Sequence, residues 1–316
     1  MDNRVKAILY QHPETIPVSV SLLPATRQRY GRELQELQAR HPLIFGTVIP
    51  EDEIKVTMPP SYRAGKRADA WGCVWENVSE GYESIVTGHP VKTREDIPRL
   101  AIPEEDIGLP HGFMFLRLTD LRGFEEMMID FAEEPPELQM LIDKVLTYNL
   151  RQVEIYVKKH EGDVMYFGDD NGMQHALPIS PAKWRKYLKP CYTAIYKVAR
   201  DAGKIVYMHT DGCIYEVIPD MVACGVQCLN PQIRANGLEN LVRTCKGKVA
   251  INLDLDRQLF PFATPSELRE HIAECARRLY LPEGGLMLHA ECAADVPLAN
   301  IEAICSALEE CSVYRN

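Results

Sequence analysis

From residue 164 onward, short apolar runs alternate with longer amphipathic segments, and this alternation limits the fold more than any other feature of the sequence. Glycine or polar residues bound the apolar runs, as is typical of buried strands in a parallel sheet. The runs lie at 164–167, 205–208, 226–229, 249–253 and 286–288. Strands that alternate with helices predict an α/β protein whose parallel strands are joined by helical crossovers.

The helices between these runs have clear start signals. Ser180-Pro181 places a capping residue before a first-turn proline, and Thr264-Pro265-Ser266-Glu267 has the form of a capping box with proline at the first helical position. Asp295-Val296-Pro297 predicts the start of the last helix.

Earlier segments extend the count of elements. Strands are predicted at 16–22 and 113–118, and helices at 124–131 and 138–156. Together with the five apolar runs, these segments give at least seven strands, close to the eight of a (β/α)8 TIM barrel. We expect such a barrel as a single domain over residues 1–316. The alternative is an open doubly wound sheet, which ordinarily has a Gly-rich phosphate loop after its first strand. The sequence after the first predicted strand has no such loop.

Residues 45–110 differ from the rest of the chain because they are rich in proline and lack a long helical period. We expect this segment to be an N-terminal insertion or lid within the barrel domain.

Composition narrows the class of protein. The chain has 35 basic and 45 acidic residues and a net charge of −10, which argues against a nucleic-acid-binding or anionic-membrane surface. No apolar run reaches the roughly 18 residues of a membrane span, and the first ten residues do not resemble a signal peptide. Ten cysteines without an export signal indicate a reducing compartment. We therefore expect a cytoplasmic protein in which most cysteines are packing residues.

Polar side chains follow five of the predicted strands, where a barrel places its catalytic groups. They are Asp169 and Asp170, His209 and Asp211, Asn230, Asn252 and Asp254, and Glu291 and Cys292. Aspartate and asparagine also end strands as ordinary turn residues. That explanation does not account for the histidine and the cysteine among them.

His209, Asp211 and Cys292 are candidate metal ligands. Residues two apart in an extended segment point the same way, so His209 and Asp211 can bind one ion, which Cys292 can reach from a later strand end. Imidazole, carboxylate and thiolate are common zinc ligands, and three protein ligands leave one position for substrate or water. The alternative is a hydrogen-bonded histidine, a helix-capping aspartate and a buried thiol.

Several motifs resemble the signature of one superfamily. They are Phe167-Gly168-Asp169-Asp170, Leu177-Pro178-Ile179-Ser180-Pro181, Met208-His209-Thr210-Asp211-Gly212 and Asp295-Val296-Pro297. In this order they resemble the uroporphyrinogen decarboxylase superfamily, and the resemblance implies a single (β/α)8 domain. Trp71-Gly72-Cys73-Val74-Trp75 is similar to a segment of its methyltransferase branch.

The resemblance also separates two chemistries. The decarboxylases have an Arg-rich loop after the first strand, and residues 23–29 contain two arginines without that pattern. The other branch consists of zinc-dependent, corrinoid-linked methyltransferases, whose thiol-methylating members have a His-x-Cys pair and a late cysteine as zinc ligands. These positions correspond to His209, Asp211 and Cys292. Asp211 stands where the resemblance implies a thiolate, and Cys213 is a candidate substitute.

Asp211 changes the expected reaction. A carboxylate is a harder ligand than a thiolate and leaves zinc more electrophilic toward an oxygen substrate. The sequence is therefore similar to the O-demethylases, which pass the methyl group of a methyl ether to a Co(I) corrinoid. No corrinoid-binding Asp-x-His-x-x-Gly motif occurs, so the corrinoid is expected on a separate carrier protein. The expected substrate is a methoxylated aromatic compound.

Other residues are assigned to the same predicted site. Glu76 is a candidate fourth ligand or proton donor, with a solvated loop acid as the alternative. Asp170 and Gln174 are expected to line the pocket, and Asp169 to cap a helix. Further candidates are Trp71 and Tyr215 for stacking on an aromatic ring, Asp254 for orienting His209 or a substrate hydroxyl, and Glu291 or Cys213 as the fourth ligand.

Three other functions stay open at this point. One is methyl transfer from a methylcorrinoid to a thiol or folate, another is decarboxylation of a porphyrinogen-like acid, and the third is corrinoid binding without catalysis. The sequence is compatible with a homo-oligomer. It leaves open the identity of the ether and the direction of transfer.

Overall fold

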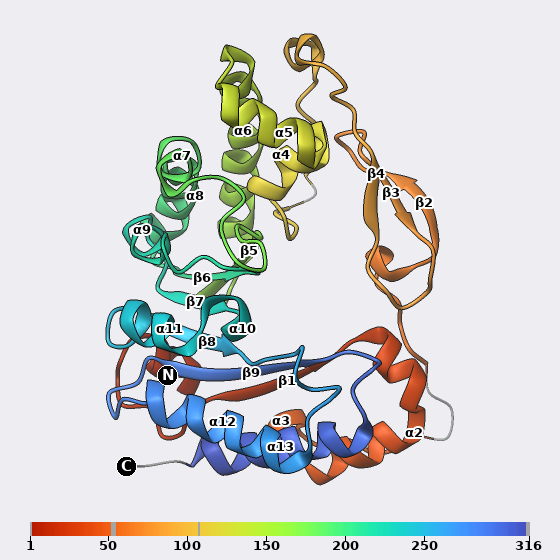
Figure 1. Cartoon of the computed structure of the whole chain (residues 1–316), viewed down its shortest axis with the longest axis vertical. Helices are drawn as coiled ribbons and strands as arrows, with labels where there is room; N and C mark the ends of the chain where they lie inside the picture. The colour runs from red at the N-terminus through yellow and green to blue at the C-terminus, as the bar shows by residue number, and fades with distance from the viewer. Residues whose placement is uncertain (1, 52–54, 107, 314–316) are drawn as a thin grey trace. The chain divides into compact units, whose positions relative to one another are not determined.

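The structure, a computed structural model, describes residues 2–51, 55–106 and 108–313 (Figure 1). The chain divides into two compact units. Unit 1 comprises residues 1–65, 77–84 and 232–316, and unit 2 comprises residues 66–76 and 85–231. The predicted insertion at 45–110 contributes residues to both units, and its assignment as a lid of one domain stays a prediction.

Unit 2 contains three parallel strands in the order β5–β6–β7. Their bounds are Val164–Gly168 for β5, Ile205–Thr210 for β6 and Cys228–Pro231 for β7. Gly168 pairs with His209, and His209 pairs with Asn230, so the carboxyl ends of the three strands are aligned. The strands confirm the prediction from three of the apolar runs.

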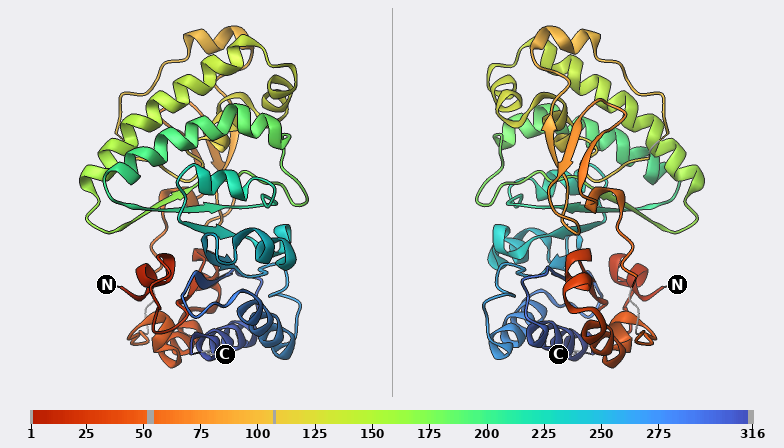
Figure 2. Two further views of the ribbon diagram at one scale, coloured as in Figure 1. Left: turned by 90° about the vertical axis from the view of Figure 1, so that its left-hand side faces the viewer. Right: turned by 90° about the vertical axis from the view of Figure 1, so that its right-hand side faces the viewer.

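The helices of unit 2 include those predicted at 124–131, at 138–156 and after Ser180-Pro181. They are α4 (Phe115–Arg122), α5 (Phe124–Glu133), α6 (Pro136–Lys159), α7 (Pro181–Lys183), a π-helical turn (Trp184–Leu188), α8 (Lys189–Asp201) and α9 (Ile218–Ala223). Ser180 caps α7 by accepting a hydrogen bond from the N–H of Lys183, as its sequence predicts. The long helices α6 and α8 pack alongside each other, and α8 contacts β6 (Figure 2).

The prediction of a strand at 113–118 is wrong, because this run begins helix α4. Phe115, Leu118 and Leu121 are buried on that helix. A short apolar run has no periodicity that separates a buried strand from a buried helix. The deciding contact is remote in sequence: the Asp169 carboxylate accepts hydrogen bonds from the N–H groups at the start of α4.

The proline-rich region contains short elements, as expected. They are the 3-10 helices η1 (Pro60–Tyr62) and η2 (Arg94–Arg99) and a small sheet of β2 (Gly65–Ala68), β3 (Val74–Asn77) and β4 (Ile85–Gly88). The strand order is β2–β3–β4, and β3 and β4 are antiparallel.

Unit 1 contains three further parallel strands in the order β1–β9–β8. Their bounds are Val18–Leu22 for β1, Leu286–Cys292 for β9 and Ala250–Asp254 for β8. The helices are α1 (Asn3–Ile8), α2 (Pro24–Arg40), α3 (Pro42–Phe45), α10 (Ile233–Asn236), α11 (Leu238–Cys245), α12 (Pro265–Leu279) and α13 (Leu298–Ser312). Both parts of the predicted capping box of α12 are present: the Thr264 hydroxyl accepts from Glu267 N, and the Glu267 carboxylate accepts from Thr264 N.

The described residues therefore form an α/β fold with six parallel strands, three in each unit. The predicted total of at least seven is not reached because 113–118 is helical, and a closed eight-stranded barrel stays a prediction. Within the described ranges, no helix combines the length and the apolar character needed to cross a membrane.

Candidate metal centre

Three side chains of unit 2 converge beyond the carboxyl ends of β5 and β6. They are His111, Asp170 and His209, whose ligand atoms all lie within 4.8 Å of one another. His111 Nε2 lies 3.0 Å from Asp170 Oδ2, and His209 Nε2 lies 3.9 Å from Asp170 Oδ1. No second group of this kind is found among the residues that the structure describes. This cluster is therefore the candidate metal centre.

The second ring nitrogen of His209 is held by an amide. His209 Nδ1 lies 2.8 Å from Asn230 Oδ1, at the end of β7. Because a carboxamide oxygen only accepts hydrogen bonds, Nδ1 donates, and a neutral imidazole then presents the lone pair of Nε2 to the cluster. Hydrogen bonds of this kind orient the histidine ligands of protein-bound metals.

Asp211 lies beside the same imidazole. Its Oδ1 is 3.2 Å from His209 Nε2, and its backbone N–H donates to Asp170 Oδ1 at 2.9 Å. The two carboxylates of Asp170 and Asp211 thus both approach the nitrogen that faces the cluster. The donors are nitrogen and oxygen atoms, which suits zinc in a site that binds oxygen substrates.

The carboxylates control the charge of the two imidazoles. Burial disfavours protonated His209, but the hydrogen bond and charge of Asp211, with the charge of Asp170, outweigh burial and raise the pKa of His209 to about 9. Burial also disfavours protonated His111, whose pKa Asp170 nevertheless raises. Burial acts to raise the pKa of Asp170, and the hydrogen bond and charge of His111 lower it below its usual value. A group of residues that stabilises positive charge in this way also favours a bound cation.

Asp169 fixes the segment that carries His111. Its carboxylate is fully buried and accepts hydrogen bonds from the N–H groups of Met114, Phe115 and Leu116 and from the Tyr192 hydroxyl. The N–H of Gly112 also donates to Gly168 O at 2.8 Å. A negative charge at a helix N-terminus is favourable, and the predicted capping role of Asp169 is confirmed.

Two glycines let the loops after β5 and β6 cross at close range. Gly212 has a φ of +83°, and a β-carbon added there would overlap the carbonyl group of Gly172. The loops are joined by hydrogen bonds from Gly172 N to Asp211 O at 3.1 Å and from Cys213 N to Met173 O at 2.7 Å. This crossing holds the backbone of Asp170 and Asp211 in place.

Comparison with known proteins decides the family. The model of the family described as uroporphyrinogen decarboxylase matches residues 114–311, which is more than half of the chain. The chain belongs to the uroporphyrinogen decarboxylase family. The resemblance seen in the sequence motifs is thereby confirmed, and the family match covers Asp170, His209 and Asp211 but begins after His111.

Solved structures show the fold of this uroporphyrinogen decarboxylase family member. A methyltransferase from Methanosarcina mazei superposes with a TM-score of 0.65 at 17% sequence identity, over 97% of each chain. An endo-β-1,4-xylanase from Gloeophyllum trabeum has a TM-score of 0.41 at 10% identity, over 63% of this chain and 74% of the xylanase. A search of curated proteins found no match.

The structure places the predicted thiol ligands away from solvent. Cys292 lies in unit 1 at the end of β9, is fully buried, and has its pKa raised by burial. Its carbonyl accepts from the Thr26 hydroxyl at 2.8 Å. Cys213 is buried in unit 2, and burial likewise raises the pKa of its thiol. The assignment of Cys292 as a zinc ligand of this family member stays a prediction.

Two predicted side chains in the proline-rich region have other partners. Glu76, on β3, lies 3.0 Å from Lys66 Nζ. Trp71 is 4% exposed and packs edge-on against Tyr148, with ring centroids 5.2 Å apart. Their roles as ligand or proton donor and as an aromatic platform stay predictions.

The remaining predicted side chains differ in exposure. In unit 2, Gln174 is exposed and Tyr215 is half-buried. In unit 1, Asp254 and Glu291 both bind Arg257. The assignments of Gln174, Tyr215 and Asp254 to a substrate pocket stay predictions.

Sequence reasoning missed His111. It lies in a loop before a segment that was expected to be a strand, so the barrel rule about carboxyl ends of strands did not apply to it. A single histidine between Pro110 and Gly112 has no metal-ligand spacing. The one available signal was the prediction that Asp169 caps a helix, because the capped helix α4 follows His111 directly.

Proposed function

We propose that this member of the uroporphyrinogen decarboxylase family is a zinc-dependent methyltransferase that takes a methyl group from a methyl ether, such as a methoxylated aromatic compound. The acceptor is the Co(I) corrinoid of a separate carrier protein. The observation that carries the proposal is the convergence of His111, Asp170 and His209, with Asp211 beside them. The similarity of fold to a methyltransferase of Methanosarcina mazei supports it.

The donor set fits a catalytic zinc site. Zinc in such sites takes three protein ligands and keeps one position open, and the cluster supplies two imidazoles and a carboxylate. When bound, zinc polarises the ether oxygen as a Lewis acid. His111, Asp170 and His209 would hold the ion. The ligand roles predicted from the sequence for Asp211 and Cys292 stay predictions.

The protein residues then have distinct tasks in the proposed reaction. Asn230 orients His209 through Nδ1, and the N–H of Asp211 holds Oδ1 of Asp170. The C–O bond to the methyl carbon breaks, its electron pair stays on the phenolate oxygen, and the methyl carbon forms a bond to cobalt. The oxygen takes its proton from solvent, and Asp211, half-buried beside the cluster, keeps its contact with His209 Nε2.

The test combines metal analysis with turnover. Purified protein is incubated with a Co(I) corrinoid carrier and a panel of methoxyarenes, and methyl–cobalt formation is followed by absorbance. We expect the wild type to react and to contain zinc, and His209→Ala to lose both properties with at least about a thousandfold loss of rate, since metal-assisted polarisation of the oxygen is removed. His175→Ala is the matched control, because it changes an exposed histidine in the loop after β5.

Three outcomes would contradict the proposal. Absence of signal from every ether, together with methyl transfer from a methylcorrinoid to a thiol or folate, would reverse the direction of the reaction. Release of CO₂ from a porphyrinogen-like acid by metal-free protein would indicate a decarboxylase. Corrinoid binding without turnover in any direction would indicate a non-catalytic protein.

A further inference from the structure

Asp170, one of the three residues of the metal cluster, lies between two buried neighbours, Asp169 and Asn171. The side-chain NH2 group of Asn171 donates to the Asp169 carbonyl at 2.7 Å, and its backbone N–H donates to the Thr210 hydroxyl at 3.0 Å. The first bond holds the peptide group before Asp170, and the second holds the peptide group after it. Because both peptide groups are held, the direction of the Asp170 side chain depends on Asn171.

The carboxamide of Asn171 is itself oriented by an indole. Trp184 Nε1 donates to Asn171 Oδ1 at 2.8 Å, and both side chains lie in residues that are only 1% exposed. An indole N–H can only donate, so it fixes the oxygen end of the carboxamide and leaves the NH2 group facing the Asp169 carbonyl. The Tyr192 hydroxyl, which donates to Asp169 Oδ2 at 2.6 Å, lies 3.0 Å from the same Asn171 oxygen.

Trp184 and Tyr192 belong to a stack of three buried rings, whose third member is Tyr196. The ring centroids are 5.7 Å apart in the first pair and 5.8 Å apart in the second. Trp184 begins the π-helical turn before α8, and such a turn contains more residues than an α-helical turn. The wider turn rotates Trp184 onto the face of the helix that carries Tyr192. The polar atoms of these two rings reach the loop after β5, whereas the Tyr196 hydroxyl lies 3.0 Å from Met208 Sδ.

A metal ligand needs support of this kind. Functional side chains must be held within about 0.5 Å of their productive geometry by packed and hydrogen-bonded neighbours. Without the indole N–H, the Asn171 oxygen would stay buried without that donor, and rotation of the carboxamide would turn its NH2 group away from Asp169. The peptide group before Asp170 would then lose its hydrogen bond.

We propose that Trp184 and Tyr192 are positioning residues of the metal centre. Trp184 acts through Asn171, whose orientation sets the direction of the Asp170 carboxylate, and Tyr192 supports the same loop through Asp169. Neither ring contacts the ion. This role rests on the zinc-binding part of the proposed function, because Asp170 is positioned for a metal ion.

Zinc affinity tests the role of Trp184. Trp184→Phe removes the indole N–H and keeps an aromatic ring in the stack. We expect the affinity of the full-length protein for zinc, measured by competition with a chelator, to fall at least about tenfold, which is the lower end of the range for residues that hold metal ligands. Co(II) bound in place of zinc should show a changed visible absorption spectrum, which reports the geometry of its ligands.

Tyr192→Phe and Tyr196→Phe form a matched pair. Each removes one hydroxyl from the same buried stack, but of the two only the Tyr192 hydroxyl reaches the loop after β5. Tyr192→Phe should weaken zinc binding by at least about tenfold as well, and Tyr196→Phe should leave it unchanged. Urea denaturation shows that each variant is folded before the metal titration, and Tyr192→Phe supplies the result if Trp184→Phe does not fold.

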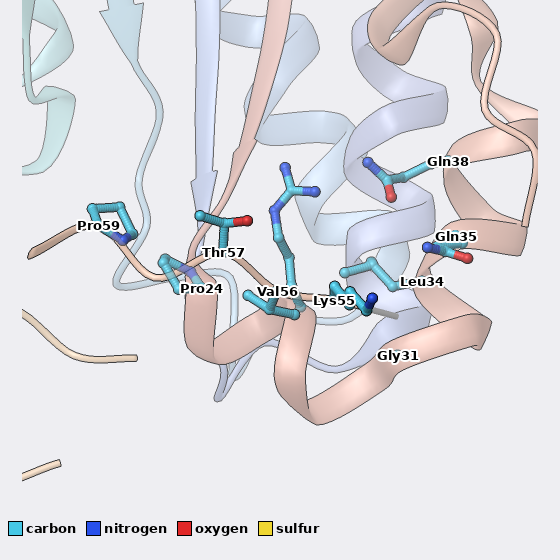
Figure 3. Close-up of a pocket in the computed structure, with 10 residues that line it drawn as sticks. Pro24, Gly31, Leu34, Gln35, Gln38, Lys55, Val56, Thr57 and Pro59 are labelled. Carbon is cyan, nitrogen blue, oxygen red and sulfur yellow. The ribbon is translucent and has the colours of Figure 1, made fainter. Parts of the chain in front are cut away.

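A remote control removes a hydrogen bond in unit 1. Gln35 lines a cavity of about 400 Å³ beside helix α2 (Figure 3), and its Oε1 accepts from the N–H of Glu51 at 2.7 Å. Gln35→Ala should therefore retain the zinc affinity and the Co(II) spectrum of the wild type.

The outcomes separate this role from the proposed reaction. Wild-type zinc affinity with an unchanged Co(II) spectrum in either folded variant, Trp184→Phe or Tyr192→Phe, would overturn the positioning role and leave the methyltransferase function standing. An equal loss of affinity in Tyr196→Phe would also overturn it, because the effect would then come from stability of the ring stack alone. A wild-type protein that binds zinc but transfers no methyl group would contradict the proposed reaction alone.

Discussion

Both units have acidic residues at their strand ends, but these residues have different partners. In unit 2, Asp170 and Asp211 follow β5 and β6 and meet imidazoles. In unit 1, Asp254 ends β8, Glu291 lies in β9, and both meet the guanidinium of Arg257. An imidazole can lose its proton and become a ligand, whereas a guanidinium in a protein keeps its charge. This difference makes the cluster of unit 2 the candidate metal site, whereas the acids of unit 1 form an ion pair with a permanent cation.

The largest effect is expected from breaking the ion pair of unit 1. Arg257→Gln leaves Asp254, whose side chain is 1% exposed, without its cation. Removing one partner of a buried pair costs about 3–5 kcal/mol, so the free energy of unfolding should fall by that amount. Urea denaturation measures it. Zinc content is measured on the same sample and should stay at the wild-type level; a loss of zinc would contradict the assignment of the metal centre to unit 2.

A slightly smaller effect is expected at the loop crossing of unit 2. Gly212→Ala places a β-carbon against the Gly172 carbonyl at a positive φ, which should cost about 3 kcal/mol from strain and overlap together. Gly203→Ala is the control, because Gly203 also has a positive φ of +75° but no atom within 4 Å of an added β-carbon. It should cost only about 1 kcal/mol. Equal unfolding free energies for the two variants would show that the loops do not depend on this crossing.

The third effect is a loss of zinc affinity caused by a residue that does not itself bind the metal. Asn230→Ala removes the acceptor that orients His209 Nδ1. Loss of such a partner typically weakens metal binding about 10–100-fold. Competition with a chelator of known zinc affinity gives the value. Asn240→Ala, a change of the same type on helix α11 of unit 1, should leave zinc affinity unaltered. An Asn230→Ala protein with wild-type affinity would show that His209 needs no orienting partner.

The smallest effect is expected at Asp120 of unit 2. Its carboxylate lies near the guanidinium of Arg117, so that it resembles the acids of unit 1 more than those of the metal cluster. Burial raises the pKa of Asp120 to about 7, an effect that Asp69 increases and Arg117 opposes. A folded-state pKa above that of the unfolded chain means that the folded protein binds the proton more tightly. The stability from this group is therefore present below about pH 4 and is lost as the pH rises through 7.

Asp120→Asn removes this dependence on pH. At pH 8 the variant should be more stable than the wild type by about 1–2 kcal/mol, and at pH 4 the two should be similar. Thermal unfolding at both pH values measures the difference. A pH-independent difference would indicate that Arg117 keeps Asp120 charged throughout.

The sequence predicted the elements that depend on local signals. The apolar runs became strands β5 to β9, and the capping signals at Ser180 and Thr264 started helices where expected. The segment 113–118 failed because its helical state depends on the carboxylate of Asp169, more than 50 residues away. His111 was missed for the same reason. A ligand supplied by a loop has no periodicity, and only the fold brings it to Asp170.

The anchoring of the loop before α4 has a consequence for how this family member can change in evolution. Loops usually accept insertions and deletions because their ends have few constraints. Here the Gly112 N–H is bonded to Gly168, and the next N–H groups of the chain reach the Asp169 carboxylate two residues later. Inserting or deleting one residue here would either move His111 by one residue along the chain or break the hydrogen bonds from the start of α4 to the Asp169 carboxylate. Relatives that keep the cluster should therefore differ by substitution in this loop, with its length preserved.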